Sequence, residues 1–342
     1  MTKPLLITFW ICLFCLPCYS QISYIDYHRK IIKAEDLFLH EKTDSSLKVY
    51  RQIFTEYKKC FAKDCFIALQ LACMTNDTAK ANYFFRKGFE NGLSWSAINS
   101  ASQVNSTFLK HTRYKERIKQ LYDACRSDYY KALDLRTRFE IKAMRYEDGL
   151  MKTNTLFDGK DRDTWARAYA PVLDINVLQL QQIVQKNGFP GEHSVGFMDH
   201  DMDYGASQSD AMLVPLASLI FFHHGCGYWM LKKELLRAVI NGELHPREYA
   251  LFYEWSFDDL HTHPGDPSRN DVCRFYNVKC SPEQQDRHYN LYIKHYMDYP
   301  DKSFVDRCRE AFGIASLAHD EQKTEYAKRH GLLLFFGLFG EI

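Results

Sequence analysis

Short amphipathic helices separated by turn-forming residues are the strongest pattern in this sequence, and they restrict the chain to a helical fold. In the segment SSLKVYRQIFTEYKKC, residues 45–60, the apolar side chains recur at steps of three and four positions. That spacing places them on one face of an α-helix. Because similar segments, closed by glycines, recur along the chain, we predict an all-α protein.

The clearest helical pair lies in the first third of the chain. Apolar and alanine-rich residues from Phe66 to Ala72 predict one helix, and ANYFFRKGFENG, residues 81–92, predicts a second helix that closes at Gly92. Asp77, in the TND turn between them, is a favourable N-cap residue. On these residues, the segment 45–125 resembles the tetratricopeptide-type repeats of exported bacterial proteins. The resemblance implies a short helical-repeat module.

A charged segment almost without Gly and Pro follows, from Lys110 to Glu147, and predicts one long connecting helix. The sequence KTNTLFDGKDRD, residues 152–163, then carries the Gly and Asp residues of a domain boundary. We therefore predict a tetratricopeptide-like module with its connecting helix over residues 21–150 and a helical domain over residues 151–342.

The second half also reads as helices. Residues 174–187 carry an apolar stripe that ends before Gly188, a favourable C-terminal cap. A further helix is expected to start near Asp210, to include Pro215 in its first turns and to end at FFHHG. Two more helices are expected on either side of NGELHP, with Pro246 at the first position of the second.

Residues 170–260 resemble a family of helical domains of unknown function. The family pattern comprises a Gly-aromatic-Pro turn, a histidine at the end of the next helix and a Gly-Glu turn. The residues that carry the resemblance are Asp174, Asn176, Gly188, Phe189, Pro190, Val195, Gly196, His224, Leu235, Ala238, Gly242, Glu243 and Ala250. The family usually has a Gln-His pair and a later Asp-Arg, where this chain has His223-His224 and Glu254-Trp255. The resemblance implies a fold and no activity.

Histidines and aspartates gather in three segments of this half, DHDMDYG, FFHHG and FDDLHTHPGD. If the segments converge, they supply the imidazole and carboxylate ligands of a divalent metal site. The candidate ligands are Asp199, His200, His224, His261 and His263. His224 is also the candidate general base. The alternative for His224 is an inward-facing histidine at a helix end that serves packing and hydrogen bonding.

The first twenty residues predict a secretory leader. Lys3 precedes an apolar run from Leu5 to Leu16, which is shorter than the roughly twenty residues of a membrane-spanning helix. We expect an exported protein, periplasmic or extracellular, without a transmembrane segment after the leader is removed. Eight cysteines follow the leader, which favours disulfides in an oxidising compartment. Cys273 with Cys280 is the predicted pair, and a local bridge among Cys60, Cys65 and Cys73 is a further possibility.

The charge balance bears on the partner. With 44 Lys and Arg against 43 Asp and Glu, the chain lacks the basic excess expected of a nucleic-acid-binding protein. Helical arrays present surfaces for peptides and proteins, so a protein- or peptide-binding or scaffolding role in the cell envelope is the first hypothesis. A metal-assisted hydrolase built on the His/Asp residues is the alternative, and a structural envelope protein without a small ligand is a third hypothesis.

Overall fold

The structure, a computed structural model, describes residues 23–157, 162–198, 213–224, 227–262 and 302–335. Those residues form helices and connecting turns with no β-strand, which confirms the all-α prediction. The first helices are α1 Tyr24–Leu39, α2 Thr43–Glu56, α3 Ala62–Met74, α4 Thr78–Glu90, α5 Trp95–Ser100, α6 Ser102–Val104, the π-helix η1 Asn105–Leu109 and α7 Thr112–Ala132. The later helices are α8 Leu135–Phe157, α9 Arg162–Asn187, α10 Ser218–His223, α11 Gly227–Ile240, α12 Pro246–Thr262, α15 Lys302–Ala311 and α16 Leu317–His330.

Helix α3 is at the centre of the first hydrophobic core. Every residue from Ala62 to Cys73 is buried, so the helix is covered on all sides. The α3–turn–α4 unit matches the predicted pair, and the side chain of Asp77 caps α4 by accepting hydrogen bonds from the N–H groups of Ala79 and Lys80. This arrangement explains why α3 lacks the one-sided polarity of a surface helix.

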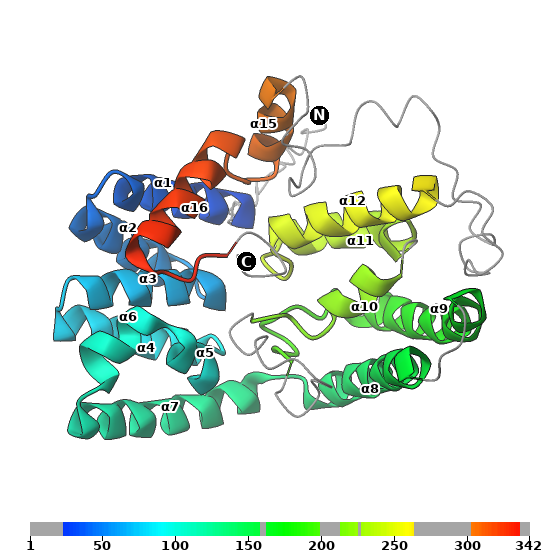
Figure 1. Ribbon diagram of the computed structural model, residues 1–342, viewed down its shortest axis with the longest axis horizontal. Helices are drawn as coiled ribbons and strands as arrows, with labels where there is room; N and C mark the ends of the chain where they lie inside the picture. Colours follow the sequence, from blue (N-terminus) through cyan, green and yellow to red (C-terminus); the bar gives the residue numbers. More distant parts are fainter. Residues whose placement is uncertain (1–22, 158–161, 199–212, 225–226, 263–301, 336–342) are drawn as a thin grey trace, which may run out of the picture.

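The prediction of a single long helix over residues 110–147 is wrong, because the helical segment is interrupted between α7 and α8. The Asp134 side chain accepts a hydrogen bond from the Thr137 N–H, and the Asp134 N–H donates to the carbonyl of Ser194. Asp134 thus starts a new helix instead of continuing the old one. In Figure 1, α7 and α8 follow each other along one side of the molecule, and α9 packs beside α8.

The prediction of a helix from Asp210 to His224 is wrong for residues 213–217, the first part of that range that the structure describes. Residues 213–217 are not helical, and Pro215 forms an antiparallel bridge with Phe197. The N–H groups of Met198 and Leu216 bond across this bridge, so the backbone is satisfied without a helix. Helix α10 begins only at Ser218, whereas the predicted glycine stop at Gly188 (φ 84°) and the start of α12 at Pro246 are both found.

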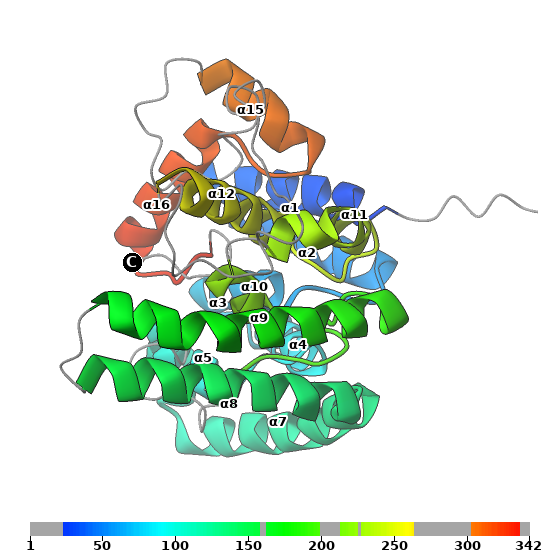
Figure 2. The ribbon, with the colours of Figure 1, turned by 90° about the vertical axis from the view of Figure 1, so that its right-hand side faces the viewer.

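Helix α16, the last described helix, packs against the first helix, α1. Figure 1 shows α16 lying across α1, and Figure 2 shows α7, α8 and α9 in successive layers with α15 at the opposite end. Gln70 of α3 exchanges two hydrogen bonds with the backbone of Leu333, at 2.8 and 2.9 Å. The N–H of Ala62 donates to Oε1 of Glu192 at 2.8 Å. The two predicted units, residues 21–150 and 151–342, are therefore joined by buried contacts.

The cysteines of the described residues do not form disulfides. Cys60, Cys65, Cys73, Cys125 and Cys308 are all free, so the local bridge considered for the first three is wrong. Cys65 and Cys73 lie two turns apart on α3, roughly 12 Å along the helix, which is too far for a disulfide. Cys60 and Cys65 interact through a hydrogen bond between their thiols and are not covalently linked. The predicted pair Cys273–Cys280 lies outside the described residues.

None of the helices in the described part of the chain is long and apolar enough to cross a membrane.

Candidate functional site

His224, the histidine singled out by the sequence, lies at the C-terminal end of α10 and is fully buried. Its Nε2 is 3.0 Å from Oδ1 of Asp174 on α9. A carboxylate partner orients the imidazole and fixes its tautomer. Both residues belong to the set that carries the resemblance to the helical domain family, and the structure places them in contact.

The neighbouring His223 has a separate carboxylate partner. Its Nδ1 is 2.9 Å from Oδ2 of Asp148 on α8, and Asp148 also accepts hydrogen bonds from Arg145 and from the hydroxyl of Tyr169. Burial raises the pKa of Asp148, but His223, Arg145 and Tyr169 outweigh burial and hold the pKa well below its usual range. Asp148 is therefore an ionised carboxylate that ties α8, α9 and α10 together.

Four of the five predicted metal ligands have side chains outside the described part of the chain. Asp199, His200 and His263 lie outside the described residues, and His261 lies in α12 with a side chain that is also outside them. In the part of the chain that is described, no group of three His, Cys, Asp or Glu side chains could hold a metal ion. Of the predicted set, only His224 has a known environment.

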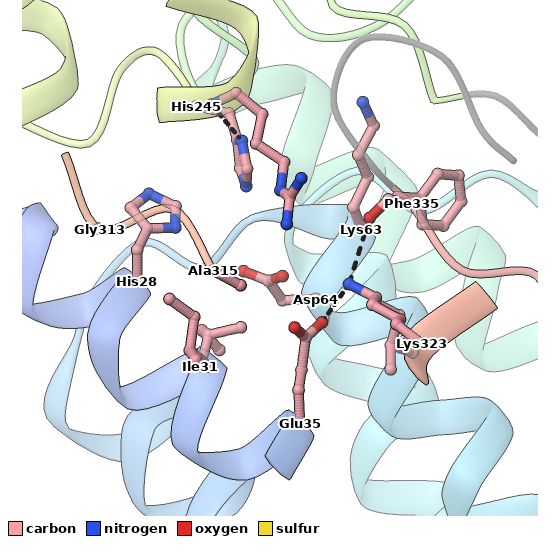
Figure 3. Close-up of a pocket in the computed structure, with 13 residues that line it drawn as sticks. His28, Ile31, Glu35, Lys63, Asp64, His245, Gly313, Ala315, Lys323 and Phe335 are labelled. Carbon is pink, nitrogen blue, oxygen red and sulfur yellow. Dashed lines mark hydrogen bonds and ion pairs between the residues drawn. The ribbon is translucent and has the colours of Figure 1, made fainter. Parts of the chain in front are cut away.

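A second group of polar residues, which sequence reasoning missed, surrounds a small cavity where α1, α3, the start of α12, the α15–α16 turn and the C-terminal segment meet (Figure 3). The cavity has a volume of about 30 Å³. We call it the charged cavity. It is lined by His28, Ile31, Ile32, Glu35, Lys63, Asp64, Ile67, His245, Arg247, Gly313, Ala315, Lys323 and Phe335.

Glu35 and Lys323 form one wall of the charged cavity. Lys323 donates to Oε1 of Glu35 and to the Phe335 carbonyl, and His319 Nε2 is 3.0 Å from Oε2 of Glu35. Burial raises the pKa of Glu35, but Lys323 and His319 lower it further than burial raises it, to about 2. An ionised Glu35 on α1 thus connects the first helix to α16.

Arg247 forms a second wall and is held by a two-pronged contact. Its NH1 and NH2 atoms donate to the two carboxylate oxygens of Asp320, at 2.8 and 2.5 Å. Arg309, only 1% exposed, donates to the same carboxylate. Such a bidentate pair fixes the plane of the guanidinium.

Lys63 and Asp64 enter the cavity from the first turn of α3. The Lys63 Nζ lies 3.6 Å from Oε1 of Glu248, and burial lowers the pKa of Lys63 although Glu248 and Glu192 act to raise it. Burial raises the pKa of Asp64 to about 7, although the 2.8 Å hydrogen bond from the Tyr27 hydroxyl acts in the opposite direction. The two neighbours therefore have opposite shifts with the same main cause.

The two histidines of the cavity are uncharged. Burial, followed by the charge of Arg247, lowers the pKa of His28 to about 3. Burial also lowers the pKa of His245 well below its usual range, with His28 and Lys63 adding to the effect. Their rings meet edge to face, with centroids 4.7 Å apart.

The sequence contained one local sign of this cavity. Glu35 lies on the apolar stripe of α1, in line with the buried Ile31 and Phe38, where an unpaired carboxylate would be costly. The remaining polar side chains of the cavity lie on segments as distant as His28 and Lys323, and no spacing rule joins such positions.

Comparison with known proteins gives no match to a protein-family model, to a curated protein or to a solved structure.

Proposed function

We propose that this protein binds a peptide, or a peptide-like segment of another protein, and that the charged cavity holds one polar group of that ligand. The observation that carries the proposal is the cavity itself, a small space walled by charged residues from helices that are distant in sequence. Within the described structure, the Nε2 atom of His28 is buried there without a hydrogen-bond partner.

The composition of the walls favours a binding site over a device for stability. Buried ion pairs often stabilise a fold less than apolar residues of the same volume would. Strongly shifted pKa values that cluster in a cavity are a common property of functional sites. Asp64 and His28 show such shifts in opposite directions, to about 7 and about 3.

The size of the cavity favours a peptide over a compact small molecule. A volume of about 30 Å³ has room for about two water molecules, since one water needs roughly 10–15 Å³. A whole ligand does not fit in that space, so only one group enters and the rest lies against the surrounding helices. Helical arrays commonly bind extended chains on their surfaces.

We also propose that the leader, residues 1–20, directs the protein out of the cytoplasm to the cell envelope or beyond. The test is N-terminal sequencing of the protein recovered from the periplasm or the medium. We expect a terminus near Gln21, whereas an intact leader on cytoplasmic protein would contradict export.

The binding test fills the cavity. Immobilised protein is incubated with a pool of random hexapeptides, and the retained peptides are identified by mass spectrometry and measured by calorimetry. Ala315, a buried residue of the cavity wall, is replaced in Ala315→Leu, and we expect at least a tenfold loss of affinity. The control is Ala132→Leu at the exposed end of α7. Failure to retain any peptide, or equal binding by Ala315→Leu, would refute the proposal.

The metal-assisted hydrolase stays a separate hypothesis, carried by His224 and its contact with Asp174. In metal sites, a carboxylate often orients the histidine ligand through the ring nitrogen that does not bind the metal. Elemental analysis of the purified protein tests the hypothesis: stoichiometric zinc, iron or manganese that is lost in His224→Ala supports it, and metal-free protein contradicts it.

A further inference from the structure

The charged cavity places three cationic side chains around one small space. Lys63, Arg247 and Lys323 come from α3, α12 and α16, and all three are buried. Each also contacts a carboxylate, so the framework is held in place before any ligand arrives. Cations fixed in a site of low polarity attract an anionic group more strongly than exposed cations do.

His245 adds a neutral hydrogen-bond donor. Its Nδ1 accepts the backbone N–H of Arg247 at 3.2 Å. Since the ring is neutral and Nδ1 is an acceptor, the proton is on Nε2. Figure 3 shows the His245 ring directed from the turn before α12 into the space beside His28. The Nε2–H of His245 is therefore a donor at the cavity.

His28 supplies the atom that lacks a partner. The residue is 3% exposed, and its Nε2 has no hydrogen bond within the described structure. An unsatisfied buried polar atom costs roughly 1–3 kcal/mol. A ligand group with oxygen atoms would give this nitrogen a partner if the tautomer carries the proton there.

The carboxylates of the wall leave room for an anion. Glu35 is paired with Lys323, and the single carboxylate of Asp320 is shared by Arg247 and Arg309, so these groups together carry an excess of positive charge. Asp64, with a pKa raised by burial to about 7, carries its proton at mildly acidic pH and then does not repel a negative group. A space of about 30 Å³ favours a small planar carboxylate over a larger tetrahedral phosphate.

We propose that the charged cavity binds a carboxylate, the C-terminal carboxylate of a peptide, through the Nε2–H of His245 and the cations Lys63, Arg247 and Lys323. This inference rests on the peptide-binding function proposed above. It specifies which end of the peptide enters and which donor recognises it.

The experiment compares two forms of one hexapeptide recovered from the random pool, one with a free C-terminal carboxylate and one with a C-terminal amide. Calorimetry with the full chain is expected to give at least a tenfold weaker affinity for the amide. In His245→Phe, which keeps a ring but removes the N–H, the preference for the acid is expected to shrink, because one donor to the carboxylate is lost while the three cations remain. His193→Phe is the matched control, because His193 also packs on Phe61 but does not line the cavity.

Failure of the inference can be told apart from failure of the proposed function. Equal affinities for acid and amide, with both abolished by Ala315→Leu, would overturn carboxylate recognition and leave peptide binding intact. An acid preference of unchanged size in His245→Phe would overturn the role of His245. Absence of any peptide binding would remove both. If circular dichroism shows that His245→Phe does not fold, His28→Phe provides the second variant, because it removes Nε2 and keeps a ring, and unchanged discrimination there would count against the cavity.

Discussion

Single buried side chains set the acid response of this protein. His28 is enclosed by Tyr27, Phe61 and His245, and it lies close to Arg247, whose charge disfavours an imidazolium. Among the described residues, Glu35 is the group whose charge favours the protonated ring, and burial outweighs it. His28 therefore stays neutral in the folded state at pH values where an unfolded chain would protonate it.

That difference gives a signed pH dependence. The pKa of His28 is about 3 in the folded protein, below the ordinary 6.5, so its contribution to stability is complete above pH 6.5 and is lost as the pH falls toward 3. In His28→Asn, the fall in the free energy of unfolding between pH 6 and pH 4 should be smaller by about 1.4 kcal/mol per pH unit. Urea unfolding at several pH values measures this slope. His111→Asn, at an exposed position, controls for the loss of one histidine, and parallel curves for wild type and His28→Asn would contradict the assignment.

At the scale of elements, local sequence signals located the helices well where capping residues and glycines act within a few positions. Asp77, Gly188 and Pro246 each start or stop a helix as predicted. The expectations that were wrong, an unbroken helix through Asp134 and a helix around Pro215, depend on hydrogen bonds to Ser194 and Gly196. Ser194 is distant from Asp134 in the sequence, and both hydrogen bonds depend on tertiary packing, which local sequence patterns do not show.

The charged cavity was missed for the same reason. Within each segment its residues look like isolated polar positions in amphipathic helices, and only the return of α16 to α1 brings them together. Glu35 on an apolar stripe was the exception, a local sign that a buried partner had to exist. The paired His224 and Asp174, in contrast, were both among the residues that the sequence resemblance singled out.

The turn between α11 and α12 provides a test of an element contact. Gly242 has φ 73°, and a Cβ there would lie 2.3 Å from the ring of Tyr24 on α1. Gly331 has a similar φ of 64°, but its nearest neighbour would be at an ordinary 3.6 Å. Gly331→Ala should cost about 1–2 kcal/mol of stability from the backbone alone, and Gly242→Ala should cost about 1–3 kcal/mol more from overpacking. Thermal unfolding measures the difference, and equal losses would show that the turn does not pack closely on α1.

At the scale of the whole molecule, buried ion pairs join the first helix, α1, and helix α12 to helix α16 near the end of the described chain. Glu35 of α1 contacts Lys323 and His319 of α16, while Asp320 of α16 holds Arg247 of α12. Buried pairs of this kind add little net stability compared with apolar packing, but removal of one partner leaves an uncompensated charge. The contact between these helices is therefore sensitive to the substitution of a single charged residue.

Asp320 is the residue whose loss should be felt most, because two buried guanidinium groups, those of Arg247 and Arg309, share its carboxylate. The pKa of Asp320 would be raised by burial, but the two arginines hold it well below its usual range. Asp320→Asn should lower the free energy of unfolding by about 3–5 kcal/mol, whereas Asp123→Asn, in an exposed pair with Lys119, should cost less than about 1 kcal/mol. Arg247→Met should be milder than Asp320→Asn, since Arg309 and Asp320 remain paired. Chemical denaturation of the three variants orders them, and an Asp320→Asn protein as stable as the Asp123→Asn control would show that the carboxylate does not hold the helices α12, α15 and α16 together.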